Sequence, residues 1–172
     1  MDNLEKFKDE YVANACYRMD ESLRMVRMAL EKIDGKQLWQ RPNTSLNSIG
    51  NLILHLCGNI TQYGIVSLYE QPDERDRDSE FSVEGGYSKA ELLQELTNTV
   101  RRAKEAFQTI SIDRHLAHKK VQGFDFSGIG NIIHVVEHFS YHTGQIAFWV
   151  KMLNDAPLGF YEGVDLNILN DE

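Results

Sequence analysis

Three histidines in one apolar segment could hold a metal ion. His134, His138 and His142 follow one another at four-residue steps. In an α-helix, residues four apart lie on one face, about 6 Å from each other, and two imidazoles at that spacing can bind one ion. Over eight residues the face turns by about 80°, so His134 and His142 are not expected to bind the same ion. The spacing therefore predicts a pair of ligands and leaves open which pair it is.

A fourth histidine, His55, lies in a second apolar stretch. Asn51, Asn59 and Gln62 share its face if the stretch is a helix. Polar side chains in the middle of a buried helix need hydrogen-bonding partners. A metal site on a facing helix would supply them. The alternative is that His55 is a hydrogen-bonded histidine of the core.

Other residues are candidates for supporting such a site. Metal-bound histidines normally donate their second ring N–H to an oxygen, and Glu137, Asn59 and Gln145 are placed to accept it. Arg18 lies on the predicted apolar stripe of the first helix, where it could meet an anionic group of a substrate. The alternative for Arg18 is that its stem packs on the helix while its charge reaches solvent. His134 is the remaining candidate for supporting the site or binding substrate. The alternative is that His134 is a hydrogen-bonded core residue on the bundle axis.

The motifs of two common helical metal enzymes are absent. The sequence contains no Glu-x-x-His, which a di-iron bundle requires, and no His-Glu-x-x-His, which marks the common metalloproteases. Three neutral nitrogen ligands would leave coordination positions open, which is typical of catalytic rather than structural sites. An ion held in that way could lower the pKa of bound water or thiol, or act as a Lewis acid.

Four long amphipathic helices are expected to position these residues. Apolar side chains at three- and four-residue steps predict helices over residues 4–33, 47–69, 88–110 and 127–154. Asn47 or Ser48 can cap the second helix, and Ser88 with Glu91 forms a capping box for the third. Gly35 stands where a C-cap glycine belongs. The fold class is therefore all-α, a four-helix bundle with long connections, in a single domain over residues 1–172.

The segments between and after these helices are expected to be irregular. Residues 71–87 read as a long loop, and residues 111–126 as an irregular stretch with a short extended piece at 120–124. His115 and His118, in that charged stretch, are expected to be solvated. The tail, residues 158–169, contains several apolar side chains and is expected to pack back on the bundle.

Composition limits the partners and the location. The net charge is −8 and no basic face is visible, which argues against binding to nucleic acid or to an anionic membrane. No apolar run is long enough to cross a membrane, and the chain opens in charged residues rather than a signal sequence. A cytoplasmic protein is expected. In that reducing compartment, Cys16 and Cys57 are interpreted as small buried residues.

Three segments resemble the DinB/YfiT-like superfamily. Residues 49–59, IGNLILHLCGN, resemble its second helix, and residues 138–146, HFSYHTGQI, resemble its fourth-helix signature His-x-x-x-His-x-Gly-Gln. Residues 39–42, WQRP, match the connection before the second helix. The resemblance extends over nearly the whole chain.

The resemblance implies a divalent metal bound by one histidine of the second helix and two of the fourth. On this sequence those are His55, His138 and His142, and the expected ions are zinc or nickel, with iron as a third candidate. Some members are S-transferases or isomerases that use bacillithiol or mycothiol, and many form homodimers. The resemblance thus favours a thiol-dependent S-transferase that acts on a small electrophile. The alternatives are a metal-dependent hydrolase of a small molecule and a non-catalytic metal-binding dimeric bundle.

Overall fold

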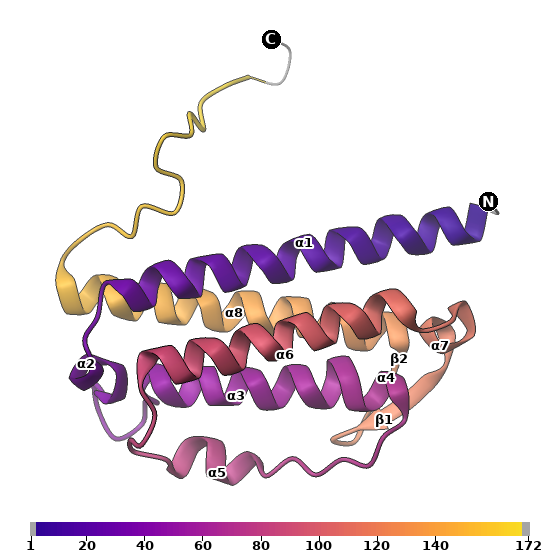
Figure 1. Cartoon of the computed structure of the whole chain (residues 1–172), viewed down its shortest axis with the longest axis horizontal. Helices are drawn as coiled ribbons and strands as arrows, with labels where there is room; N and C mark the ends of the chain where they lie inside the picture. The colour runs from indigo at the N-terminus through magenta and orange to yellow at the C-terminus, as the bar shows by residue number, and fades with distance from the viewer. Residues whose placement is uncertain (1–2, 170–172) are drawn as a thin grey trace.

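Four long helices lie side by side and enclose the core (Figure 1). A computed structural model describes residues 3–169. The helices are α1 (Asn3–Glu31), α3 (Ile49–Thr61), α6 (Lys89–Thr109) and α8 (Gly128–Asn154). A π-helical turn, η1 (Gln62–Val66), and α4 (Ser67–Tyr69) extend α3. The all-α four-helix bundle predicted from the sequence is confirmed. Fully buried core side chains come from all four helices and include Met19, Val26, Leu56, Ile60, Leu96, Phe107, Phe139 and Ile146.

Serine side chains define where three of these helices begin. Ser48 accepts a hydrogen bond from the backbone N–H of Asn51, and Ser88 accepts one from that of Glu91. In both cases the later side chain bonds back to the serine backbone, which completes a capping box. Ser127 accepts from the backbone N–H of Gly130 at the start of α8. These boundaries agree with the prediction because caps depend on residues close in sequence.

Two short helices occupy connections that were predicted to be irregular. Helix α2 (Gly35–Trp39) begins at Gly35, so the prediction that this glycine ends the first helix was wrong. Asp34 caps α2, and no residue of this connection has a left-handed backbone conformation. Helix α5 (Arg77–Ser82) lies within the stretch predicted to be a loop. In Figure 1 it runs beside α3, the helix that carries His55.

A small two-stranded hairpin precedes α8 in the chain and packs against that helix. After α7 (Ile112–Leu116), strands β1 (His118–Val121) and β2 (Phe124–Ser127) pair antiparallel. Gln122 and Gly123 join them with positive φ values of 51° and 86°, as a two-residue hairpin turn requires. The predicted extended piece was therefore only the centre of a longer two-stranded element.

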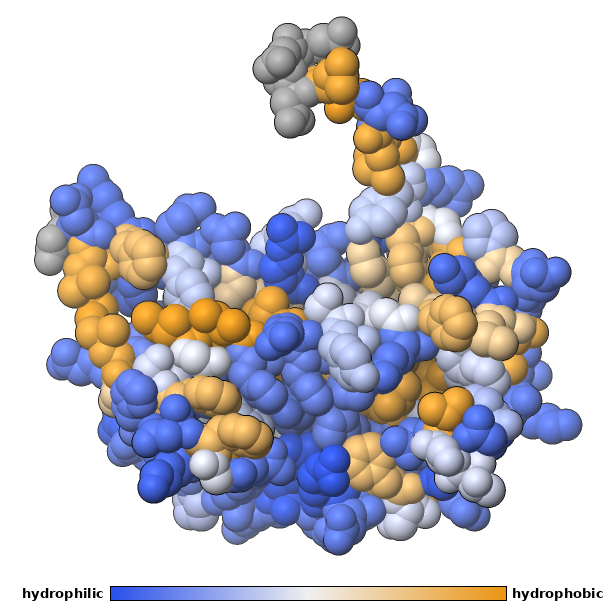
Figure 2. Space-filling model, turned by 180° about the vertical axis from the view of Figure 1, so that it is seen from behind, coloured by the Kyte–Doolittle hydropathy of each residue, from blue (hydrophilic) through white to orange (hydrophobic). Residues whose placement is uncertain are grey.

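The C-terminal tail packs on the bundle only at its beginning. Leu158 is buried, and the Phe160 carbonyl accepts a hydrogen bond from Arg24 of α1. Beyond that point the tail leaves the body of the molecule, and Val164 and Leu166 are 59% and 69% exposed (Figure 1). The predicted packing of the tail is thus wrong beyond Phe160. Figure 2 shows the projecting tail from behind, with apolar patches separated by polar side chains on the rest of that face.

None of the helices described over residues 3–169 combines the length and apolar character needed to cross a membrane.

Candidate metal centre

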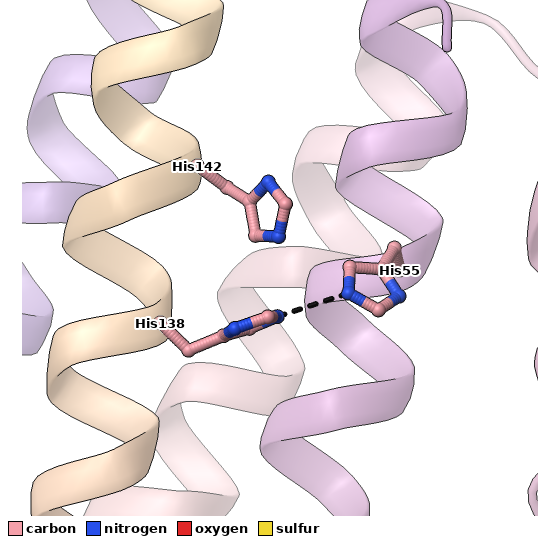
Figure 3. A group of neighbouring side chains, drawn as sticks. All are labelled: His55, His138 and His142. Atoms are coloured by element: carbon pink, nitrogen blue, oxygen red, sulfur yellow. Dashed lines mark hydrogen bonds between the residues drawn. The ribbon is translucent and has the colours of Figure 1, made fainter. Parts of the chain in front are cut away.

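Three histidine side chains converge in the space between α3 and α8. His55 comes from the middle of α3, and His138 and His142 come from successive turns of α8 (Figure 3). The Nε2 atoms of His55 and His138 are 2.9 Å apart. One ring nitrogen from each of the three lies within 4.8 Å of the others. A tetrahedral ion with bonds of about 2.0–2.1 Å separates its ligand nitrogens by about 3.3 Å. The three histidines therefore could bind one metal ion.

Hydrogen bonds to oxygen leave the inner nitrogens of two rings free for an ion. His55 Nδ1 is 2.9 Å from Glu80 Oε2, and His142 Nδ1 is 2.7 Å from Gln145 Oε1. Both oxygens can only accept, so in the tautomer that makes these two hydrogen bonds each Nδ1 carries the proton and each Nε2 has a lone pair. Gln145 is one of the three acceptors that the sequence offered, with Glu137 and Asn59. Metal-bound histidines in proteins usually have this arrangement.

Glu80 is a supporting residue that the sequence reasoning missed. Its carboxylate accepts from Arg75 Nε at 2.7 Å and from Arg75 Nη2 at 2.9 Å, in addition to His55. Arg75 Nη1 donates to Gln62 Oε1 at 2.8 Å, and Gln62 in turn donates to Asp73. The side chains of Arg75 and Glu80 are 6% and 8% exposed. A buried, fully bonded ion pair thus fixes the outer nitrogen of His55.

A glycine in α3 makes room for this carboxylate. Gly58 follows His55 by three residues, and a Cβ atom at Gly58 would lie 1.9 Å from Glu80 Oε1. Glycine costs about 1 kcal/mol in a helix interior compared with alanine. Its presence at this point was the signal in the sequence that another side chain approaches α3 closely. The signal does not say which side chain that is.

The electrostatics of the site favour neutral imidazoles beside an ionised carboxylate. Burial alone would raise the pKa of Glu80, but hydrogen bonds from Arg75 and His55 hold it below its usual range. Burial and the neighbouring histidines lower the pKa of His138 to about 3. Burial also lowers the pKa of His142, against the hydrogen bond to Gln145. At neutral pH the histidine lone pairs are therefore available to a cation.

Comparison with known proteins places this geometry in a family. Residues 6–160 match the family described as "Protein of unknown function (DUF1572)". The chain belongs to this family. No curated protein matches the chain.

Two solved structures have a similar fold at low sequence identity. A conserved protein from Enterococcus faecalis superposes with a TM-score of 0.71 at 12% identity, over 84% of this chain and 97% of that one. A DinB-like protein from Bacillus subtilis, YjoA, superposes with a TM-score of 0.62 at 13% identity, over 81% and 91%. The resemblance to the DinB/YfiT-like superfamily is thereby confirmed at the level of the fold.

His134 and Asn59 lie beside the three histidines rather than among them. The group that could hold an ion does not include His134, in agreement with the angular argument from the sequence. Asn59 Nδ2 donates to His134 Nε2 at 3.2 Å, and the His134 ring lies 4.1 Å from that of Tyr63. Burial lowers the pKa of His134, which keeps this ring neutral as well. These contacts place both residues next to the site, where a substrate-binding role stays a prediction.

Arg18 and Glu137 do not join the site. Both line a groove between α1 and α8, and Arg18 is exposed, with its guanidinium 5.5 Å from the ring of Tyr17. The sequence placed Arg18 on the apolar stripe of α1, but the buried apolar side chains of this helix include Met19, Leu23 and Val26 and do not include Arg18. The expectation for Glu137, an oxygen acceptor for a ligating histidine, is met by Glu80 and Gln145 instead.

The remaining histidines and cysteines lie apart from the three ligands. Cys16 and Cys57 are free and buried, as expected for small core residues. His118 is exposed and contacts Asp125, as expected for a solvated residue. His115 was expected to be solvated, and this is wrong: it is 3% exposed, because α7 places it against Gly128 at the start of α8.

Proposed function

We propose that this protein is a metal-dependent S-transferase, which joins a low-molecular-weight thiol to a small electrophile. The observation that carries the proposal is the set of three inward-facing imidazole nitrogens, two of them backed by fixed oxygen acceptors. Three neutral ligands leave a divalent ion with open positions and its full positive charge. The proposed reaction involves neither a nucleic acid nor a membrane.

His55, His138 and His142 would hold the ion. When bound, the ion would supply a positive charge that favours the thiolate form of a thiol at an open position. The thiol loses its proton to solvent, the sulfur forms a bond to the electrophilic carbon, and the leaving group departs with the electron pair of its former bond. In this scheme Glu80 keeps the proton on Nδ1 of His55, and Gln145 keeps that on Nδ1 of His142.

Zinc or nickel is the proposed ion, with iron as the third candidate. Imidazole is a suitable ligand for all three, and the site has no thiolate or ligating carboxylate that would favour another metal. Elemental analysis of freshly purified protein identifies the ion. A His138→Ala variant should contain much less of it, because that ring supplies one of the three candidate ligand nitrogens.

Thiol consumption tests the reaction. Metal-loaded protein is mixed with bacillithiol, mycothiol or cysteine and with chlorodinitrobenzene, and the conjugate is followed by absorbance. The expected result is conjugate formation that chelation abolishes and added metal restores. Hydrolysis of the electrophile without thiol would favour a metal-dependent hydrolase. Metal binding without turnover of any thiol and electrophile pair would contradict the transferase proposal and favour a non-catalytic metal-binding protein.

A further inference from the structure

A row of four aromatic rings, each tilted by no more than 26° from the next, leads from the histidine site to the surface. Successive centroids of His138, His134, Phe126 and Phe124 are 5.4, 6.3 and 5.8 Å apart. The corresponding planes differ by 21°, 26° and 6°. Phe126 is half-buried, and Phe124 is 59% exposed. The run therefore begins at a candidate metal ligand and ends in solvent.

A glycine of α8 allows Phe126 to continue the row of histidines. Gly130 precedes His134 by four residues and His138 by eight, so the three lie along one side of the helix. A Cβ atom at Gly130 would lie 3.1 Å from Cβ of Phe126, which is tighter than ordinary packing. The phenyl ring of the hairpin thus lies where a side chain of α8 would otherwise project.

The hairpin that supplies these rings is tied to the core of the bundle. The hydroxyl of Tyr63 donates to Gln122 Oε1 at 3.1 Å and lies 3.4 Å from the Val121 carbonyl oxygen. Tyr63 is 1% exposed and its ring packs against His134. It belongs to the π-helical turn η1, and such turns occur often at functional sites. The position of the rings is therefore determined by buried contacts and not by a free loop.

We propose that His134, Phe126 and Phe124 form an aromatic shelf that selects electrophiles with a planar apolar group. The planar group stacks on the shelf while the reacting atom points to the sulfur at the three histidines. Offset stacking of aromatic rings adds about 0.5–1.5 kcal/mol to the burial of the ring, a gain that an aliphatic substrate does not obtain. Phe124 and Phe126 are specificity-determining residues in this proposal, which rests on the metal site of the proposed function.

Binding of inert metal ligands tests the shelf separately from any reaction. Acetohydroxamate, benzohydroxamate and naphthohydroxamate bind a metal through the same group and differ in their planar part. Their Kd values are measured on cobalt-loaded protein from the change in the visible spectrum. We expect each added ring to tighten binding roughly three- to tenfold. Phe126→Ala and Phe124→Ala should bring the ratio of naphthyl to acetyl affinity towards one.

Phe148→Ala is the matched control, because Phe148 is an exposed phenylalanine of α8, 63% accessible, outside the shelf. The control should keep the wild-type ratio. Two results would overturn the shelf and leave the metal site intact. One is equal affinity of the wild type for the three hydroxamates, and the other is an aryl preference that survives both shelf variants. A protein that takes up no cobalt would overturn both proposals. Loss of a dimer in the shelf variants, with the aryl preference retained, would show that the hairpin contacts a second copy instead.

Discussion

Replacing Glu80 by glutamine should weaken metal binding without removing a metal ligand. The carboxylate accepts hydrogen bonds from His55 Nδ1 and from two nitrogens of Arg75. Glutamine has nearly the same size but only one acceptor oxygen, and its NH₂ group can only donate. It therefore cannot satisfy all three donors. Either His55 loses the acceptor that fixes its ring, or Arg75 retains a buried charge without a counterion.

The two consequences have different sizes and are measured separately. Loss of the oxygen behind a ligating histidine typically costs about 10- to 100-fold in metal affinity, which corresponds to about 1.4–2.7 kcal/mol. Removal of one charge from a buried ion pair costs about 3–5 kcal/mol of stability. The side chains of the pair are both less than a tenth exposed, so screening by solvent does little to reduce that cost.

The assay is a competition titration of Zn²⁺ against a chromogenic chelator at neutral pH, together with urea unfolding of the metal-free protein. Glu84→Gln is the control, because Glu84 is an exposed acid of the same connection and its loss changes the net charge equally. We expect wild-type affinity in the control and reduced affinity in Glu80→Gln. A folded Glu80→Gln protein that binds Zn²⁺ as tightly as the wild type would refute the reasoning that Glu80 orients His55.

Three further changes test other parts of the structure. Gly58→Ala places a methyl group 1.9 Å from the Glu80 carboxylate, so metal affinity should fall in the same titration, whereas Gly144→Ala, which has open space around it, should leave affinity unchanged. The pKa of His138 is about 3 in the folded protein against 6.5 in the unfolded chain, so below about pH 6.5 the unfolded state binds more protons. The stability of the metal-free protein should therefore be fully present above that pH and fall towards pH 3, as urea unfolding across this range will show; a flat profile would contradict the buried neutral ring. Ser88→Ala removes a helix cap and should lower stability by about 1 kcal/mol without altering metal affinity.

The parts of the fold that depend on neighbouring residues were predictable from the sequence. The caps at Ser48 and Ser88 each involve a residue only three positions away, and the helices that follow have regular apolar stripes. The spacing that lets His138 and His142 face one ion, and the contact of His142 with Gln145, follow from the geometry of a single helix. The choice of this pair over His134 and His138 came from the family resemblance. The angular argument that set His134 apart has the same local basis.

The parts that depend on distant residues were not predictable in the same way. Glu80 is 25 positions from His55, in a connection rich in charges, and nothing in its spacing separates it from the exposed acids around it. Helix α5 has six residues, too few for a clear apolar period. The hairpin strands have four residues each, and a two-residue turn at Gln122 and Gly123 is a weak signal without a tertiary context. His115 likewise reads as solvated because only the packing of α7 buries it.

The hydrogen bond at Nδ1 of His142 is therefore local to one helix, whereas the hydrogen bond at Nδ1 of His55 depends on a distant segment of the chain. His142 is oriented by a residue of its own helix, so its geometry persists as long as α8 is folded. His55 is oriented by Glu80, and Glu80 is held by Arg75, both of which belong to the connection between α4 and α6. A displacement of that connection would leave all three ligands in the bundle but would free the ring of His55. The helices thus determine which histidines meet, and the connection determines how firmly one of them is held for an ion.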